Sequence, residues 1–405
     1  MHILFHALAA SSGSGLTYVR NVAPVLSRRS DMRATFLVGP ELGRELRAFP
    51  NVAFQVLQQP KSVARRFLWE QQAVPRLARD LQADVLVSAG NFAVRQSSVP
   101  QILLSGNSLY TSADYRRDLL ARHEYRLWLD NGLRAFFAAR SVGWADATVA
   151  PSQAFADDLR QWTGLDRVVA IHHGFDRSVF FNDDTPLPES LQLPLRASDG
   201  CLRLLFVSHY NYFRNFETLF RSLRLIREML PASNAKLVLT TRLISSENPG
   251  DFRAESAAAL VRELGLADHV VELGAIPYRQ LHHVYRACDL YVTPSYAETF
   301  AHPLVEAMAC GLPVVASDLP VHREVAAEAA VYFPRFSAEA LAQRVTEVVS
   351  SPTLAQRLSR YGEQRGLEFS WDKHVDQLVD LAKSLAQGRP SPGGRPLARG
   401  SIQQV

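Results

Sequence analysis

The sequence contains little cysteine and no long apolar run. Its 405 residues include three cysteines, Cys201, Cys288 and Cys310, which lie in apolar surroundings without metal-ligand spacing. We therefore expect neither a disulfide framework nor a cysteine-ligated metal, and we expect a reducing compartment, the cytoplasm. A transmembrane helix needs about eighteen consecutive apolar residues, and none is expected here. The opening MHILFHALAASS has no Lys or Arg before its short apolar run, which is typical of a buried strand rather than of a signal peptide.

Two familiar fingerprints are also missing. A dinucleotide-binding loop requires G-x-G-x-x-G, whereas residues 13–18 read GSGLTY. This departure argues against a nicotinamide-dependent dehydrogenase. No Asp-x-Asp pair occurs, and we expect neither a metal ion nor a cofactor. The net charge of +4 permits attraction to phosphates or to an anionic membrane leaflet without specifying either, and no nucleic-acid partner is expected.

Short β-rich runs alternate with helical stretches, which predicts parallel sheets built from βαβ units. Two series of such runs are separated by a polar segment with Pro and Asp, residues 183–200, which we interpret as a linker. The expected strands cover residues 2–8, 34–39, 52–57, 84–90, 101–106 and 147–152, then 202–208, 236–243, 269–274, 289–295, 313–317 and 329–333.

These patterns predict two α/β domains, and the remainder of the chain is assigned by periodicity. A helical apolar pattern follows Phe369, whereas the final residues are rich in Pro, Gly, Ser and Arg and are expected to be disordered. The predicted division is residues 1–182, linker 183–200, residues 201–368, a helix within 369–388 and a tail, 389–405.

The most informative stretch covers residues 289–333. Its strand runs into a loop, a helix opens near His302 or Pro303, and Gly311 ends that helix. Open α/β sheets bind ligands where the carboxyl end of a strand meets the start of a helix. The backbone N–H groups of Thr299, Phe300 and Ala301 are therefore expected to face a ligand and to attract a diphosphate.

Two carboxylates, Glu298 and Glu306, frame the start of this helix. An acid beside an anion-binding helix terminus repels phosphate, so these groups are better suited to accept hydrogen bonds from sugar and ribose hydroxyls. The alternative is that they only complement the helix dipole.

The E-x7-E pattern followed by AMACGLPVVAS resembles the signature of the retaining GT-B glycosyltransferases of the family four group. Further segments resemble that family in the expected order: residues 11–15 its glycine-rich loop, 149–159 the last strand and helix of its first domain, 172–176 its interdomain element, 208–220 its phosphate-binding segment, 273–277 its base-facing loop and 371–378 its crossing helix. The resemblance implies two Rossmann-like, doubly wound domains, an acceptor-side domain followed by a nucleotide-sugar domain, with a cleft between them.

The resemblance also implies roles for single residues. Glu306 would hold the ribose hydroxyls, and Glu298 would contact the transferred sugar or its phosphate side. Arg214, beside Asn215 in the donor site, would replace the usual Lys at the diphosphate and could bind it bidentately. Ile276 would line the base pocket through its backbone.

Other positions depart from the family or leave alternatives open. Gly13 and Gly15 would let the backbone approach the diphosphate, or they form an ordinary tight turn. Ala301 replaces a glycine and narrows the space beside the sugar, and His302 either reaches the substrate or caps the helix. Asn107 stands where relatives often have a catalytic His, which leaves His123 and His209 as further candidates.

The implied function is transfer of a sugar from a nucleoside-diphosphate sugar to a hydroxyl of a sugar or lipid-linked acceptor, in bacterial polysaccharide, lipopolysaccharide or glycolipid synthesis. A non-catalytic nucleotide-sugar-binding module, a GT-B epimerase and a phosphorylase-like enzyme are the alternatives. Residues 61–69 mix Lys and Arg with Phe, Leu and Trp. They form either a solvated helix face or an interfacial helix that holds the protein at the inner face of the plasma membrane.

Overall fold

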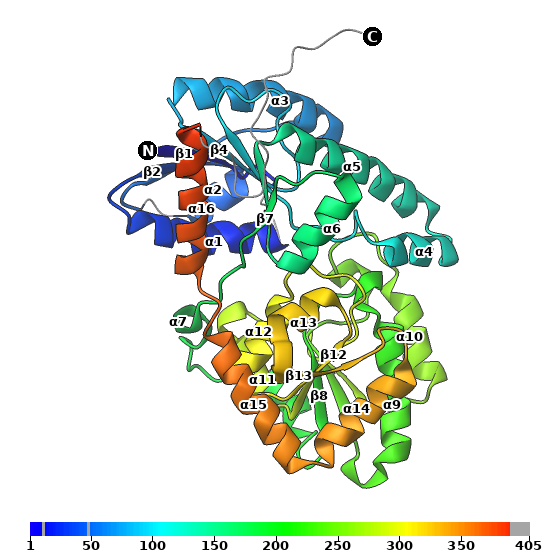
Figure 1. Cartoon of the computed structure of the whole chain (residues 1–405). Helices are drawn as coiled ribbons and strands as arrows, with labels where there is room; N and C mark the ends of the chain where they lie inside the picture. Colours follow the sequence, from blue (N-terminus) through cyan, green and yellow to red (C-terminus); the bar gives the residue numbers. More distant parts are fainter. Residues whose placement is uncertain (10–12, 47–48, 389–405) are drawn as a thin grey trace. The chain divides into compact units, whose positions relative to one another are not determined.

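A computed structural model describes residues 1–9, 13–46 and 49–388, and the chain divides into two compact units (Figure 1). Unit 1 holds residues 1–111 and 129–174 together with the helix that starts at Trp371, and unit 2 holds residues 112–128 and 175–370. Each unit contains one parallel β-sheet. None of the helices in the described ranges has both the length and the apolar character that a membrane span requires.

The sheet of unit 1 has the strand order β3-β2-β1-β4-β5-β6-β7, and every neighbouring pair is parallel. Its order therefore changes direction between β1 and β4. The strands are β1 (His2–His6), β2 (Arg33–Val38), β3 (Val52–Val56), β4 (Val85–Ala89), β5 (Gln101–Leu104), β6 (Ala147–Ala150) and β7 (Val168–Ala170).

Helices cover both faces of this sheet, because alternate strand residues are apolar on each side. Ile3 and Phe5 point to the face covered by α1 and α16, and Leu4 and Leu8 point to the face covered by α3. The helices of this unit are α1 (Gly13–Ser27), α2 (Pro40–Glu45), α3 (Val63–Asp80), α5 (Tyr125–Trp144, from Leu129 on), α6 (Gln153–Thr163) and α16 (Trp371–Ala386).

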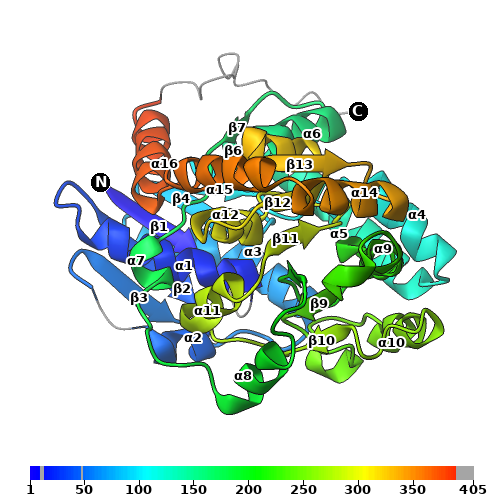
Figure 2. The ribbon, with the colours of Figure 1, turned by 90° about the horizontal axis from the view of Figure 1, so that it is seen from below.

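The sheet of unit 2 has the order β10-β9-β8-β11-β12-β13, so its direction changes between β8 and β11. Its strands are β8 (Arg203–Phe206), β9 (Lys236–Leu239), β10 (Val270–Glu272), β11 (Leu290–Thr293), β12 (Val314–Ser317) and β13 (Ala330–Phe333). Its helices are α4 (Ala113–Ala121), α7 (Arg177–Phe180), α8 (Glu189–Arg196), α9 (Phe216–Met229), α10 (Ala254–Glu263), α11 (Leu281–Arg286), α12 (His302–Ala309), α13 (Pro320–Ala326), α14 (Ala338–Val349) and α15 (Pro352–Gly366). Figure 2 shows α12 beside β11 and β12, which it contacts.

The twelve strands expected from the sequence are present. The structure also contains the strand β7 and the helix α8, which the sequence pattern did not predict. The strand β7 has only three residues, too short to give a periodic signal. Helix α8 lies inside the expected linker 183–200. Residues 11 and 12 of the expected glycine-rich loop and the tail 389–405 lie outside the described residues.

Residues 112–128 belong to unit 2 although they come from the first half of the chain. Polar contacts explain this placement. The Asp118 carboxylate accepts a hydrogen bond from the Tyr296 hydroxyl at 2.6 Å, and Glu124 accepts one from Tyr212 at 2.7 Å. Asp114 is paired with Arg335 at 2.6 Å. The sequence-based domain ranges 1–182 and 201–368 therefore differ from the compact units, and they stay predictions of domain extent.

Helix α16 supplies part of the core of unit 1, because Trp371, Val375 and Leu378 are buried in a cluster with α1 and β4 residues. We expect Leu378→Ala to lower the free energy of unfolding by about 2–5 kcal/mol, the usual cost of such a core truncation. Gln377, the exposed neighbour, gives the matched control Gln377→Ala. Urea denaturation of both variants checks this, and equal stability of the two would contradict the core role of α16.

Candidate active site

The residues singled out in the second half of the chain follow strands of the unit 2 sheet and so lie at its carboxyl edge. Arg214 lies in η1 (Tyr212–Arg214), which follows β8, and Glu298 lies in the loop after β11. These two strands are neighbours at the point where the strand order changes direction. Such a switch point is where open α/β sheets form ligand sites.

Arg214 and Glu298 form an ion pair through Nη1 and Oε1. The same Nη1 donates to the Ser295 hydroxyl at 3.3 Å, and the guanidinium carbon lies 5.0 Å from the Phe213 ring centroid. Burial lowers the pKa of Arg214 to about 10, so the side chain keeps its charge at neutral pH. Its Nε is buried and has no hydrogen-bond partner among the described residues. A cationic donor is therefore held in place beside the Glu298 carboxylate.

Glu306 is buried within α12, one turn after the start of the helix. The Tyr285 hydroxyl donates to its Oε2 at 2.9 Å. Burial raises the pKa of Glu306 to about 7, and the hydrogen bond from Tyr285 opposes this shift only in part. At neutral pH the carboxyl group is consequently close to half ionised and ready to accept hydrogen bonds from a ligand.

The loop before α12 places the backbone in a strained form. Ala301 precedes the helix with φ of 64°, in the left-handed region that non-glycine residues rarely adopt. Phe300 is buried, with ring centroids 5.0 Å from His302 and 5.2 Å from Phe369. Thr299 is half-buried in the same loop. The alanine noted in the sequence thus occupies a position whose conformation favours glycine.

Asn215 and Ile276 are further residues of unit 2 that the sequence singled out, as are the exposed His123 and His209, whose roles stay predictions. Asn215 is left-handed, with φ of 57°, and its amide group donates to the carbonyl oxygens of Pro294 and Arg335 at 3.1 and 2.7 Å. It therefore fixes η1 against the loop after β11, and its contact with the donor stays a prediction. Ile276 is half-buried in the segment between β10 and α11.

The remaining residues lie in unit 1. Gly13 and Gly15 belong to the first turn of α1 rather than to a loop, and residues 11 and 12 of the expected loop lie outside the described residues. The Asn107 side-chain oxygen accepts a hydrogen bond from the Leu109 N–H at 3.0 Å, a local turn after β5. Its catalytic role stays a prediction, as do the roles of the two glycines.

Sequence analysis missed several residues of the unit 2 site. Tyr285 of α11 contacts Glu306, and Ser295 of the loop after β11 contacts Arg214, but single hydroxyl residues carry no motif. His322 of α13 is fully buried, and burial lowers its pKa to about 4, so the ring is neutral. Its Nδ1 lies 3.1 Å from the Ser317 hydroxyl, and its Nε2 has no hydrogen-bond partner in the described chain. The sequence signal that could have indicated His322 is its position two residues after Pro320, at the start of α13.

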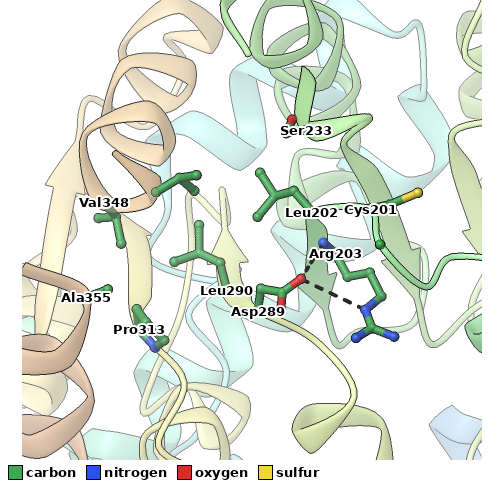
Figure 3. A pocket seen from close by; sticks show the side chains of 11 residues that line it. Cys201, Leu202, Arg203, Ser233, Asp289, Leu290, Pro313, Val348 and Ala355 are labelled. Atoms are coloured by element: carbon green, nitrogen blue, oxygen red, sulfur yellow. Dashed lines mark hydrogen bonds and ion pairs between the residues drawn. The ribbon is translucent and has the colours of Figure 1, made fainter. Parts of the chain in front are cut away.

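A pocket of about 500 Å³ lies at the opposite, amino edge of the same sheet (Figure 3). Leu202, Asp289 and Pro313, which line it, stand just before β8, β11 and β12. The Arg203 backbone N–H donates to the Asp289 carboxylate at 2.8 Å there. The pocket is therefore separate from the switch-point residues.

Comparisons with known proteins agree with the fold and show the family. The family model described as Glycosyltransferase Family 4 matches residues 17–179, and the one described as Glycosyl transferases group 1 matches residues 195–365. The chain belongs to the GT-B glycosyltransferases of the family four type. The Glu298 and Glu306 region lies within the second match, so the resemblance read from those residues is confirmed.

Solved structures of low sequence identity share this GT-B fold. Sucrose-phosphate synthase from Thermosynechococcus elongatus aligns with a TM-score of 0.74 and 19% identity, over 95% of this chain and 99% of that one. The Anabaena protein HepE, solved in complex with UDP-glucose, aligns with a TM-score of 0.69 and 18% identity, over 95% and 100%.

A curated relative is the D-inositol 3-phosphate glycosyltransferase of Segniliparus rotundus, 27% identical over 253 residues and 61% of this chain. The match spans 54% of the length of that relative, little more than half.

The raised pKa of Glu306 predicts a pH dependence of nucleotide binding. The charged carboxylate accepts hydrogen bonds from hydroxyls better than the neutral acid, so affinity should rise as the pH passes upward through about 7. Titration calorimetry with UDP should give an affinity about tenfold higher at pH 8 than at pH 6. Glu306→Gln should bind more weakly and lose this dependence, because the amide does not titrate. An unchanged pH profile in that variant would remove Glu306 from the nucleotide site.

Proposed function

We propose that the protein transfers a glycosyl unit from a nucleoside-diphosphate sugar to an acceptor hydroxyl and retains the anomeric configuration. The observation that carries the proposal is the ion pair of Arg214 and Glu298 at the switch point of unit 2, with Glu306 buried in the helix that follows the same loop. A buried cation, an ion-paired carboxylate and a hydroxyl-accepting carboxylate match the three parts of such a donor: diphosphate, sugar and ribose.

The chemistry follows from the charge that develops during transfer. As the glycosidic bond breaks, negative charge grows on the departing diphosphate. Arg214 and the N-terminal N–H groups of α12 supply fixed positive charge there, and Glu298 holds the guanidinium in position. This protein-borne charge is the basis on which we propose transfer without a metal ion.

The names and ligands of the relatives suggest which substrates should be tested first. UDP-glucose is the first donor, because it is bound in the HepE structure. Inositol 3-phosphate is the first acceptor, because it appears in the name of the Segniliparus relative. Sugar and lipid-linked acceptors of bacterial polysaccharide, lipopolysaccharide or glycolipid synthesis follow, with the reaction placed in the cytoplasm. A non-catalytic nucleotide-sugar-binding module would bind UDP-glucose without releasing UDP, and an epimerase would change the sugar while it stays on the nucleotide.

Steady-state kinetics on Arg214 variants test the proposal. Arg214→Ala should lower kcat as well as raise the donor KM, because its contact strengthens in the transition state, and Arg214→Lys should recover part of the loss. We expect UDP release to persist in excess chelator and the product to keep the donor's anomeric configuration by NMR.

A control separates catalysis from folding. Arg214→Ala leaves Glu298 buried without its partner, which is destabilising, whereas Arg214→Ala combined with Glu298→Gln removes both charges. The double variant should regain thermal stability without regaining activity. Unchanged kcat/KM in Arg214→Ala, or a strict need for Mg²⁺, would contradict the scheme.

We also propose peripheral membrane association through unit 1. On α5, Leu129, Leu133 and Phe136 are exposed at 63%, 60% and 52%, at helical spacing on one side. Helix α3 contacts α5 through the rings of Phe67 and Phe137, 5.3 Å apart, and exposes Leu68. Lys61, Arg65 and Arg140 are exposed on the same two segments. Apolar side chains flanked by cations suit the interface of an anionic bilayer.

Vesicle sedimentation measures this association. The full-length protein should bind vesicles of phosphatidylglycerol and phosphatidylcholine, and binding should weaken with added salt or without the anionic lipid. Leu129→Gln with Leu133→Gln should reduce binding severalfold, because the apolar area that enters the interface is lost. The matched control is Leu367→Gln, an equally exposed leucine of unit 2. Equal binding by both variants would contradict the proposed surface.

A further inference from the structure

A buried histidine of unit 2 is linked to Arg214 by hydrogen bonds that the proposed chemistry does not yet use. His322 lies on α13, the helix that follows β12, and it is fully buried. The other buried side chains of this helix, Val321, Val325 and Ala326, are apolar. Burial of a polar ring costs free energy that an apolar side chain does not cost, unless hydrogen bonds offset it. The hydrogen bonds of His322 therefore distinguish it from the rest of α13.

The partners of His322 fix the position of its proton. Its Nδ1 lies 2.9 Å from the carbonyl oxygen of Ser317 and 3.1 Å from the hydroxyl oxygen of the same residue. Because a carbonyl oxygen can only accept, Nδ1 carries the proton and donates it. Burial lowers the pKa of His322 to about 4, and the positive charge of Arg214 adds to this effect, so the ring is neutral at physiological pH. The ring is thus a single, fixed donor at the carboxyl end of β12.

Ser317 extends this restraint to the loop after β11. Its hydroxyl donates to the carbonyl oxygen of Ser295 and is left to accept from His322. The Ser295 hydroxyl accepts the Arg214 Nη1–H group at 3.3 Å. Both serines are fully buried, so these bonds do not compete with bonds to water. A series of hydrogen bonds therefore joins α13 and the end of β12 to the guanidinium that follows β8.

We propose that His322 is a positioning residue that fixes the place of the Arg214 guanidinium. The restraint runs through Ser317 and Ser295, and His322 itself makes no contact with the donor in this scheme. The inference rests on the proposed function, in which Arg214 meets the diphosphate. A single carboxylate, Glu298, leaves the guanidinium free to turn about the ion pair, whereas Ser295 gives Nη1 a second acceptor. A neutral ring suits this place, because a cationic ring would repel Arg214.

Titration calorimetry with UDP and with uridine tests the proposal. His322→Leu keeps a buried apolar side chain but removes the donor. It should weaken UDP binding about threefold to tenfold, the range expected for one hydrogen bond. Uridine has no diphosphate, so its affinity should change by less than about twofold. His322→Asn, whose amide N–H group can replace the Nδ1–H group, should recover part of the loss.

Val325→Ala is the matched control, because it removes packing from the same helix and leaves the hydrogen bonds in place. It should lower the melting temperature without changing the ratio of the UDP and uridine affinities. Equal losses of UDP and uridine affinity in His322→Leu would overturn the proposal, because they would show general damage to unit 2.

A double-mutant cycle shows whether His322 acts through Arg214. The background is Arg214→Ala with Glu298→Gln, which removes both charges of the ion pair. In that background His322→Leu should change UDP affinity by less than about twofold, because the group that it positions is gone. The same loss in this background as in the wild type would overturn the proposal.

Ser317→Ala interrupts the same series of bonds while His322 stays in place. In NMR spectra of protein with isotope-labelled arginine, the Arg214 Nε–H signal is assigned by its loss in Arg214→Lys. This signal should shift in Ser317→Ala and stay in place in Val325→Ala, and an unshifted signal in Ser317→Ala would overturn the proposal. A shifted signal together with UDP affinity that is unchanged when Arg214 is replaced would contradict the donor chemistry alone and support the positioning role.

Discussion

The ion pair between Arg214 and Glu298 is the interaction on which the unit 2 site depends. A guanidinium buried at the edge of a sheet requires a partner, and removing either charge leaves the other desolvated. The strand order supplies that partner, because β8 and β11 are neighbours although 84 residues separate the paired side chains. Asn215 and Ser295 then hold the segments after the two strands at the right spacing. Chain topology, rather than any local motif, thus creates the cationic site.

The segment of residues 112–128 reinforces the same two loops. Its Asp118 bonds Tyr296, two residues before Glu298, and its Glu124 bonds Tyr212, two residues before Arg214. The Arg122 guanidinium also pairs with Glu217 at 2.8 Å. This segment from the first half of the chain therefore stabilises the loops that carry the candidate donor-binding charges.

Much of the fold could be predicted from the sequence, because apolar periodicity and the placement of Pro303 and Gly311 are local signals. These signals indicated the positions of the strands, the start of α12 and the helix α16. The short strand β7 and the helix α8 gave no comparable signal. The candidate residues could be named from their motif, but the pairing of Arg214 with Glu298 could not, since it depends on strand order.

The central claim is that the switch point of unit 2 binds the nucleoside diphosphate of a sugar donor. A crystal structure of the protein with UDP tests it most directly. We expect the diphosphate within hydrogen-bond distance of Arg214 and the backbone N–H groups at the start of α12, with the ribose hydroxyls on Glu306. UDP bound elsewhere, such as in the pocket at the amino edge of the sheet, with Arg214 and Glu306 untouched, would contradict the account.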